Sequence, residues 1–439
     1  MVLEKQKRPT VLLAATLWWP ASARLALRFI EYGCRVVAIC PRGHLLTHVV
    51  GIEKVYHYDR LSSLRSLELA VRNARPDFLV PCDDRAVWQA HELHESQPDL
   101  RPLLEDSLGA PAGYQVTRHR ARLLGRARDL GVRVPETVRV ESERDVEAWF
   151  RRHPSAVLKL DDTWGGDGVK IVRSKREAIA AYTKLSRLAG IATACKRMII
   201  NQDPLALWDW GRRTNPVITI QRVVEGRPAN AMIACWRGEV LDMVTVEVLA
   251  SQGATGAALM VRVVDSAEVA TAARRLVEDL KLTGFCGLDF MVEAGTGAFH
   301  LIEMNPRCTQ LGHLAAGREH DLAGVLFARL AGLGRPPIAV PIRNKVIAFF
   351  PQADAWTPRS PFLHSGHHDV PWQQPDLMRE ISREPWPDRQ WRARLYHLVN
   401  PSPHVPAMEF EASGPIQAPA EDASPQGVAV DYSRGRLGG

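Results

Sequence analysis

The sequence predicts an α/β region followed by an α+β region. Three observations support this prediction. Apolar, strand-like runs alternate with helical patterns from residue 10 to about residue 110, an order typical of a parallel, doubly wound sheet. Beyond residue 150, short strand patterns follow one another with few helices between them, which indicates antiparallel pairing in an α+β region. The length of 439 residues is enough for two or three domains.

The N-terminal region has the strand and helix patterns of a doubly wound domain. We expect strands at 11–16, 35–40, 54–58 and 77–80, and helices at 21–32 and 61–74. Ligands of such sheets lie beyond the carboxyl ends of the strands, where residues 16–23 and 81–84 fall. No G-x-G-x-x-G follows the first strand, because Trp18, Trp19 and Pro20 stand there instead. This disfavours a nicotinamide dinucleotide as the ligand.

The second region begins with a helical pattern at 117–131, which Gly131 and Pro135 end. A further helix is expected at 266–282, and strands at 156–160, 169–172, 217–224, 230–236, 239–248, 287–293 and 299–304. Segment 201–216 interrupts these strands as a long loop. Loops of this length are uncommon unless they are functional or disordered.

These patterns divide the chain into an N-terminal α/β domain at 1–112 and a second domain at 113–335. A lobe at 158–225 of the second domain contains a glycine-rich segment. Residues 336–412 form a C-terminal extension with weaker patterning. Residues 413–439 are rich in Ser, Pro, Ala and Gly, so we expect a disordered tail there.

Composition excludes several classes of protein. No run reaches the roughly 18 to 20 apolar residues of a membrane helix, so we expect no membrane partner and a cytoplasmic location. The net charge is +7, but the arginines are spread along the chain and mixed with acids, so we expect no nucleic acid partner. The seven cysteines are scattered and include no C-x-x-C, which indicates reduced core thiols rather than disulfides or a zinc site.

A candidate metal site lies in the sequence Glu303-Met304-Asn305-Pro306-Arg307. The strand pattern at 299–304 predicts that Leu301, Glu303 and Asn305 share one face, because side chains repeat every second residue. A carboxylate and an amide oxygen on one face can hold a hard cation. Arg307 follows directly and offers a planar fork for a carboxylate or a phosphate.

A third ligand is expected from Asp289, which is the acid within an otherwise apolar strand at 287–292. Such an acid is costly unless it is paired or bound to a metal. A hairpin through 293–298 would bring Asp289 close to Glu303. The structural alternative is that nearby arginines satisfy both acids.

The second candidate cluster is Lys159 and the glycine-rich turn that follows it, with Gly165, Gly166 and Gly168. A lysine within a buried strand needs an anion as its partner. The backbone N–H groups of a glycine-rich turn can contact phosphate oxygens. The glycine spacing does not match a P-loop.

Two weaker features lie further along the chain. His313 follows Arg307 by six residues and faces either an acceptor site or the core. The histidine-rich segment 364–369 matches no ligand spacing of a known metal motif, so an exposed loop is the favoured interpretation.

The order of lysine, glycine-rich loop, hinge strand, acid and E-x-N-P-R resembles the ATP-grasp superfamily over about residues 110–330. The resemblance implies a two-subdomain ATP-grasp fold that clamps ATP, with Lys159 on the α- and β-phosphates. It implies that Gly165, Gly166 and Gly168 close over the phosphates. It further implies Mg²⁺, or alternatively Mn²⁺, on Asp289, Glu303 and Asn305.

The resemblance also implies an adenine site and a further phosphate contact. Adenine would lie against the hinge strand, here Gln221, Arg222, Val223 and Val224. Gln221 stands where the family often has glutamate. The family often has a second phosphate-binding lysine, and here the candidates are Arg118, which we select, and Arg120.

The activity implied is that of a carboxylate–amine ligase. ATP would convert a small-molecule carboxylate, held by Arg307, into an acyl phosphate, which an amine or a thiol would then capture. A carbamoyl-phosphate-synthase-like or carboxylase use of bicarbonate is the alternative among enzymes. A nucleotide-binding regulator without catalysis is the alternative of another class. The expected partners are ATP, an acid and an amine, and a homodimer is compatible with the sequence.

Overall fold

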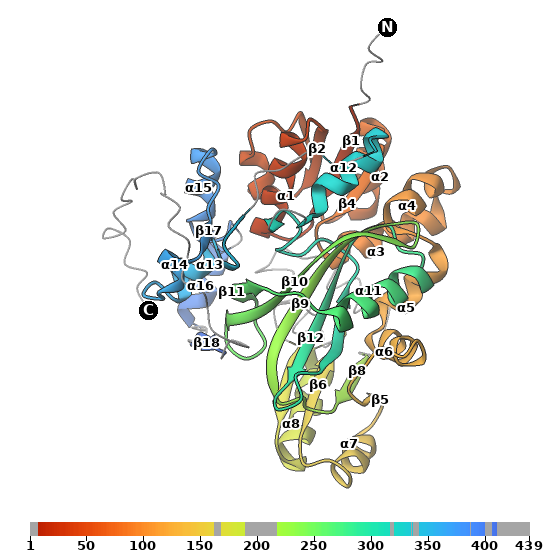
Figure 1. Ribbon diagram of the computed structural model, residues 1–439, viewed down its shortest axis with the longest axis vertical. Helices are drawn as coiled ribbons and strands as arrows, with labels where there is room; N and C mark the ends of the chain where they lie inside the picture. Colours follow the sequence, from red (N-terminus) through yellow and green to blue (C-terminus); the bar gives the residue numbers. More distant parts are fainter. Residues whose placement is uncertain are drawn as a thin grey trace, which may run out of the picture.

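The computed structural model describes residues 8–161, 168–188, 217–316, 320–334, 336, 342–386, 388–399 and 406–410. The described residues form an N-terminal α/β domain, a large sheet and a small antiparallel lobe, which Figure 1 shows from top to bottom in red to orange, green and yellow. The predicted fold class, a doubly wound domain followed by a two-subdomain α+β unit, is confirmed.

The N-terminal sheet is fully parallel, with the strand order β3 (Lys54–His57), β2 (Arg35–Cys40), β1 (Thr10–Ala14) and β4 (Phe78–Pro81). Helix α1 (Pro20–Glu31) packs on one face of this sheet. The other face is covered by α2 (Ser63–Ala74), α3 (Asp84–Ser96) and α4 (Arg101–Leu108). Alternate strand residues enter the two cores, because successive side chains of a strand point to opposite faces.

The small lobe is a four-stranded antiparallel sheet with the order β5 (Thr137–Val140), β8 (Ile218–Gln221), β6 (Ala156–Leu160) and β7 (Val169–Val172). Helices α7 (Glu143–Phe150) and α8 (Lys175–Leu188) cover one face through a shared apolar core. Leu158 and Leu160 belong to that core. Lys159, between them, therefore points to the uncovered face of the lobe.

The large sheet connects the rest of the chain. Its strand order is β13 (Phe299–Asn305), β12 (Gly284–Glu293), β9 (Gly226–Trp236), β10 (Glu239–Ser251), β11 (Ala258–Val263), β16 (Val346–Phe349) and β17 (His367–Asp369), and β18 (Met408–Glu409) pairs with β10. The last three of these strands come from the predicted C-terminal extension. The predicted C-terminal extension therefore contributes strands to the large sheet.

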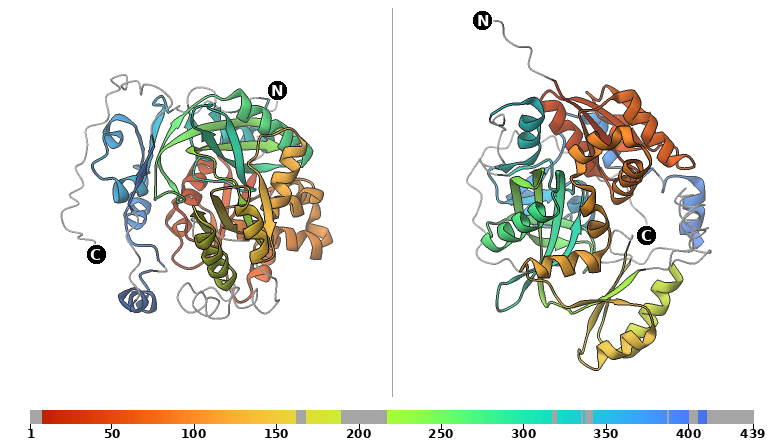
Figure 2. Two further views of the ribbon diagram at one scale, coloured as in Figure 1. Left: turned by 90° about the horizontal axis from the view of Figure 1, so that it is seen from below. Right: turned by 90° about the vertical axis from the view of Figure 1, so that its right-hand side faces the viewer.

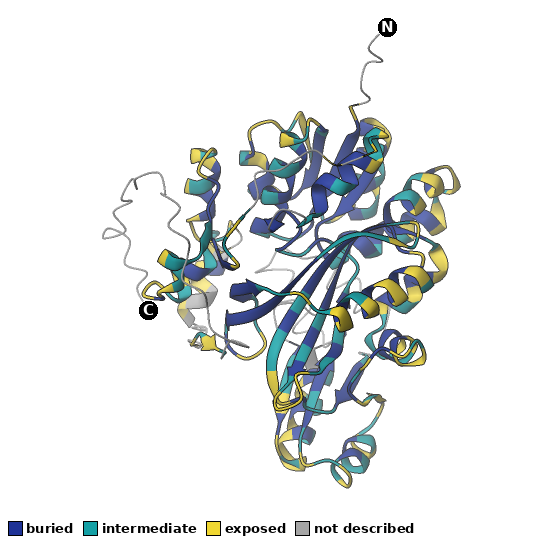
Figure 3. Cartoon of the chain, in the orientation of Figure 1, coloured by how far each residue is buried: buried dark blue, intermediate teal, exposed yellow. Residues whose placement is uncertain are grey.

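Helices cover both faces of the large sheet. Helices α6 (Arg120–Asp129) and α11 (Ala267–Asp279) pack on one face of β9, β12 and β13. Helix α12 (Leu322–Ala331) and α1 of the N-terminal domain lie on the other face, in one continuous core with both sheets. Figure 3 shows the buried strands of this sheet between more exposed helices. The shared core joins the N-terminal domain to the large sheet.

The remaining elements are short. Near the C-terminal edge lie α13 (Gln352–Trp356), α14 (Phe362–Ser365), α15 (Pro375–Ile381) and α16 (Trp391–Val399). Figure 2 (left) shows this blue segment on the opposite side of the large sheet from the orange helices of the N-terminal domain. A two-stranded pair joins β14 (Ala315–Ala316) to β15 (His320–Asp321), and 3-10 turns span Leu45–His48, Pro98–Leu100 and Pro111–Gly113.

The helix predicted at 117–131 is divided in two. Helix α5 (Tyr114–Arg118) ends one residue before α6 begins, because His119 has an extended backbone with φ −111° and ψ 111°. The apolar periodicity of this segment did not reveal the break. Arg118 and Arg120 therefore belong to two different helices.

The structure bears on two predictions made from composition, which concern the cysteines and membrane helices. The described cysteines, Cys34, Cys40, Cys82, Cys235, Cys286 and Cys308, are all buried and unpaired, as expected for core thiols, and Cys195 lies outside the described residues. None of the described helices is both long and apolar enough to cross a membrane.

His44 in the N-terminal domain gives a test of this packing. Its ring is buried, Nδ1 accepts from Leu46 N at 3.1 Å, and Nε2 lies 3.0 Å from Leu17 O. Burial lowers the pKa of His44 to about 4. The unfolded chain therefore binds the additional proton between about pH 4 and about pH 6.5, so lowering the pH destabilises the fold, by up to about 1.4 kcal/mol per pH unit.

We expect the melting temperature of His44→Asn to fall less steeply than that of wild type between pH 7 and pH 5. Asparagine keeps an acceptor for Leu46 N but does not titrate. Differential scanning calorimetry measures both slopes. Equal slopes would show that His44 has the same pKa in the folded and the unfolded chain, which would contradict the lowered pKa.

Candidate active site

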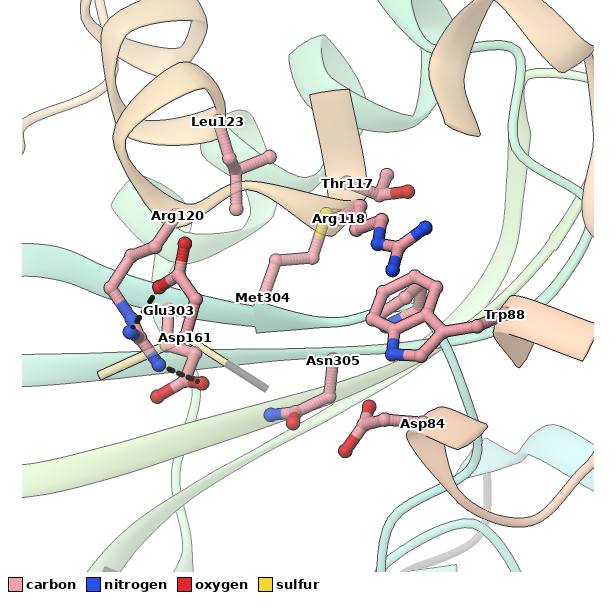
Figure 4. A pocket seen from close by; sticks show the side chains of 11 residues that line it. Asp84, Trp88, Thr117, Arg118, Arg120, Leu123, Asp161, Glu303, Met304 and Asn305 are labelled. Carbon is pink, nitrogen blue, oxygen red and sulfur yellow. Dashed lines mark hydrogen bonds and ion pairs between the residues drawn. The ribbon is translucent and has the colours of Figure 1, made fainter. Parts of the chain in front are cut away.

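An open pocket of about 500 Å³ lies where the N-terminal domain, the small lobe and the edge of the large sheet meet. Figure 4 shows the side chains around it. Residues from α3, α5, α6 and the ends of β6 and β13 line the pocket: Asp84, Trp88, Thr117, Arg118, Arg120, Leu123, Asp161, Glu303, Met304, Asn305 and Pro306. The pocket is therefore built from four parts of the chain that are far apart in the sequence.

The two candidate metal-binding acids face each other across adjacent strands. Asp289 of β12 pairs in register with Glu303 of β13, as the predicted hairpin requires. Asn305 donates to Asp289 Oδ2 at 3.0 Å, and Asn230 of β9 donates to Asp289 Oδ1 at 2.6 Å. Asn230 was not predicted, because β9 was recognised from the sequence without its pairing to β12.

The register corrects one detail of the sequence analysis. Leu301 pairs with Phe290 while Glu303 pairs with Asp289, so Ile302 is an extra residue in the ladder. This bulge turns Leu301 into the apolar core under α11, where it is fully buried. The prediction that Leu301 shares a face with Glu303 and Asn305 was wrong, because strict two-residue periodicity fails at a bulge.

The two carboxylates have opposite pKa shifts. Burial and the nearby charge of Glu303 raise the pKa of Asp289 to about 6. Burial alone would also raise the pKa of Glu303, but the charges of Arg120 and Lys159 hold it below its ordinary value. Two half-buried acids this close repel each other, and a cation between them would remove that repulsion.

Lys159 reaches from the small lobe to the large sheet. Its side chain is 5% exposed, and its Nζ donates to the carbonyl oxygen of Ile302, the bulge residue, at 3.4 Å. Burial and the charge of Arg120 lower the pKa of Lys159 to about 8. A buried ammonium next to Arg120 is best stabilised by an anion, and a phosphate group provides one.

The structure gives different surroundings to Arg118 and Arg120, the two candidates for the second phosphate contact. Arg120 forms ion pairs with Asp161 at 2.7 Å and with Glu303 at 2.8 Å, so it links the small lobe to the metal-site acid. Arg118 lies on the other side of the pocket, with its guanidinium carbon 5.5 Å from the ring centre of Trp88 (Figure 4). Of the two, Arg120 is the one beside Lys159 and Glu303.

Arg307 is held by an acid from the N-terminal domain. Its Nε and Nη2 lie 2.9 and 3.0 Å from the two carboxylate oxygens of Asp84, and Nη2 also donates to Asn305 Oδ1 at 3.3 Å. Burial would lower the pKa of Arg307, but Asp84 keeps it above its ordinary value. The fork that we expected to hold a ligand is therefore occupied by Asp84 in this structure.

Asp83 and Asp84 lie beyond the carboxyl end of β4, where ligands of a doubly wound sheet are expected. Both belong to the segment 81–84 that the sequence analysis selected beyond β4. Asp83 caps α3 and accepts from Thr16 N and Thr16 Oγ1, so it joins the ends of β1 and β4. The rule identified the segment, but not the role of each residue.

The predicted hinge begins at the last residue of β8, continues beyond the strand, and does not line the pocket of Figure 4. Gln221 is buried, pairs with Val157 on the strand of Lys159, and donates to Thr137 Oγ1 at 2.9 Å. Arg222 lies 3.8 Å from Glu293, Val223 is half-buried and Val224 is buried.

The glycine-rich turn is only partly described. Gly165 and Gly166 lie outside the described residues, as does the loop 201–216. Gly168 is buried, and its carbonyl oxygen accepts from Leu160 N at 2.9 Å, which closes the β6–β7 hairpin next to Lys159.

The donor set was tested for its fit to a metal ion. Among the described residues, no group of three or more His, Cys, Asp and Glu could hold a metal ion. Asp289, Glu303 and Asn305 provide two carboxylates and one amide, which suit a hard cation that takes its remaining ligands from phosphate oxygens and water. Burial and the charge of Glu303 raise the pKa of Asp289, and a cation held by the two acids would oppose that shift.

Comparison with known proteins identifies the class. A family model for the ATP-grasp domain matches residues 121–310. The chain therefore carries an ATP-grasp domain over these residues. A search of curated protein sequences found no match.

Solved structures share the fold at low sequence identity. N5-carboxyaminoimidazole synthetase from Staphylococcus aureus, complexed with ADP, is 12% identical, covers 75% of this chain and 78% of its own, and has a TM-score of 0.55. The biotin carboxylase domain of the Hydrogenobacter thermophilus 2-oxoglutarate carboxylase, in complex with MgADP and bicarbonate, is 14% identical, with 76% and 72% coverage and a TM-score of 0.56. L-amino acid ligase from Bacillus licheniformis is 13% identical, with 74% and 75% coverage and a TM-score of 0.52.

Proposed function

We propose that this protein is an ATP- and Mg²⁺-dependent ligase that activates a carboxylate as an acyl phosphate and joins it to an amine or a thiol. The observation that carries the proposal is the meeting of Lys159, from the small lobe, with Glu303, Asp289 and Asn305 from the large sheet. A buried cation faces a half-buried acid pair across the pocket. This arrangement suits a triphosphate held by a lysine on one side and by a metal ion on the other.

Each residue has a defined part in the proposed reaction. Lys159 binds the phosphates, with the hinge at Gln221, Arg222, Val223 and Val224 proposed for adenine. Mg²⁺ on Asp289, Glu303 and Asn305 would neutralise the charge that develops on the phosphates. Arg120 holds Glu303 ionised, and Arg307 holds Asn305 in place.

The proposed chemistry has two steps. A carboxylate oxygen of the acid attacks the γ-phosphorus, and the bond from that phosphorus to the bridging oxygen breaks, which releases ADP. The amine nitrogen or thiol sulfur then attacks the carbonyl carbon of the acyl phosphate. The bond from that carbon to the phosphate oxygen breaks, phosphate leaves, and the proton of the nucleophile passes to solvent. Positioning and electrostatics carry the catalysis.

Trapping with hydroxylamine tests the proposal without knowledge of the natural nucleophile. The protein is incubated with ATP, Mg²⁺, hydroxylamine and one acid at a time, and ADP and hydroxamate are measured. We expect an acid-dependent release of ADP with an equal amount of hydroxamate. ADP release without hydroxamate would contradict an acyl phosphate. Nucleotide binding without ADP release across broad acid and amine pools would favour a non-catalytic regulator.

A second enzymatic function uses bicarbonate as the acid. The fold likeness to a biotin carboxylase domain, whose structure contains bicarbonate, supports this candidate. It requires bicarbonate-dependent ADP release in the absence of other acids. The same assay, run with bicarbonate alone in degassed buffer, distinguishes the two functions.

A further inference from the structure

Arg118 and Arg120 line the pocket, and Arg307 directly follows the lining residue Pro306. Two of these three arginines already contact acids. Arg120 contacts Asp161 and Glu303, and Arg307 contacts Asp84 through Nε and Nη2. Arg118 differs, because no carboxylate contacts it among the residues that the structure describes. It is exposed at the pocket, with the ring of Trp88 beneath its guanidinium. Arg118 is therefore the arginine whose hydrogen-bond donors remain available to a ligand.

Arg118 stands on a stack of aromatic side chains. The ring of Trp88 lies 5.7 Å from that of His91, and His91 stacks on Tyr114 at 3.8 Å. Thr117, the residue before Arg118, is buried and donates to Tyr114 O at 3.0 Å. A guanidinium held by its face on an indole keeps the N–H groups at its edge for a planar anion. The stack thus positions Arg118 before a ligand arrives.

The charges around Arg118 favour one carboxylate rather than two. Burial and the charge of Arg118 lower the pKa of His91 to about 3, so His91 adds no second positive charge on this side. The acids of the pocket, Asp84, Asp161 and Glu303, would repel another carboxylate of the ligand.

Apolar side chains form part of the pocket lining. Leu123 and Met304 lie between Arg118 and Arg120 in Figure 4, and Pro306 also lines the pocket. Apolar side chains favour a hydrocarbon part of the ligand, because its burial removes apolar surface from water. The pocket therefore combines one available cation with an apolar wall.

We propose that Arg118, supported by Trp88, binds the carboxylate of the acid substrate, and that this substrate is a monocarboxylic acid with a compact apolar body. The proposal rests on the proposed ligase function. It replaces Arg307 with Arg118 as the anchor of the acid, and it removes Arg118 from the nucleotide. Specificity for the acid then comes from α3 and α5, which lie outside the strands that carry the metal-site residues.

The test uses the full chain in the hydroxamate assay, with butyrate and 3-phenylpropionate as monocarboxylates and succinate and glutarate as dicarboxylates. For Arg118→Gln we expect the KM for the best monocarboxylate to rise by roughly 10- to 100-fold, and the KM for ATP to change less than about threefold. Arg118→Lys should recover part of the loss, because it keeps the charge but not the fork. Trp88→Leu should raise the KM for the acid by a smaller factor.

Arg122→Gln is the matched control, because Arg122 is an exposed arginine one turn further along, on α6, outside the pocket lining. It should leave both KM values unchanged. A rise in the KM for ATP in Arg118→Gln, with the KM for the acid unchanged, would assign Arg118 to the nucleotide and overturn the proposal. A preference of wild type for the dicarboxylates would also overturn it. Absence of hydroxamate with every acid would instead contradict the ligase function itself.

Discussion

Replacing Glu303 with glutamine is expected to lower ADP release by roughly 10²- to 10³-fold, a loss of about 3 to 4 kcal/mol of transition-state stabilisation. Glutamine has nearly the same shape but no charge. The substitution removes the negative charge of a proposed metal ligand next to Asp289. It also removes one of the two ion pairs of Arg120 and leaves the one with Asp161. The loss should appear in kcat, because the metal is needed most where phosphate charge develops.

The measurement is steady-state ADP release at several Mg²⁺ concentrations, together with calorimetric titration of MgATP. Glu239→Gln is the control, because Glu239 lies on the same sheet and pairs with Arg329 but is 68% exposed. We expect the control to behave as wild type. Unchanged kcat and unchanged Mg²⁺ dependence in Glu303→Gln would exclude Glu303 as a metal ligand.

Replacing Asp369 with asparagine is expected to destabilise the protein by roughly 3–5 kcal/mol, the usual loss when one member of a buried ion pair is removed. Asp369 ends β17 and is 4% exposed. It accepts from His313 Nε2 at 2.8 Å and forms an ion pair with Arg24 of α1. The carboxylate thus joins the N-terminal domain, the loop after β13 and the last strand of the large sheet.

Thermal unfolding measures the effect, and the melting temperature should fall by several degrees. Asp376→Asn is the control, because that carboxylate also pairs with an arginine, Arg379, but is 69% exposed and should contribute less than about 1 kcal/mol. Burial alone would raise the pKa of Asp369, but His313 and Arg24 hold it well below its ordinary value.

This lowered pKa determines the pH dependence of the effect. A carboxyl with a depressed pKa in the fold stabilises it above its unfolded pKa of about 3.9, and that contribution is lost as the pH falls further. The difference between wild type and Asp369→Asn should therefore be constant near neutral pH and narrow below about pH 4. A difference that is already absent at pH 7 would show that the buried contacts of Asp369 do not stabilise the fold.

The segment 364–369 shows where sequence interpretation was limited. The favoured interpretation was an exposed loop, but His367–Asp369 is strand β17, and Asp369 and His313 meet in the interior. No local sequence pattern at His313 or at Asp369 predicts that these two side chains are in contact. Asp369 lies 56 residues after His313 in sequence, and their contact depends on β16 and β17 joining the large sheet.

The sequence by itself determined the order of the elements and the two clusters of the site. Apolar runs of four to six residues predicted β1, β2, β4 and β6. A strand that buries one or both faces needs apolar residues at alternate or at all positions, and this pattern is visible in the sequence. Lys159 and Asp289 were selected because a charge within an apolar strand requires a partner. The hairpin that brings Asp289 to Glu303 was also predictable, because the two strands are neighbours along the chain.

Only the tertiary structure decided the partners of the charged groups. Arg120 and Glu303 are 183 residues apart in sequence, and Arg307 and Asp84 are 223 apart. Local periodicity contains no information on such pairs, because they form when three sheets pack together and each buried charge takes the nearest opposite one. The break at His119 and the bulge at Ile302 similarly depend on packing, and they place Arg118 on Trp88 and the Ile302 carbonyl under Lys159.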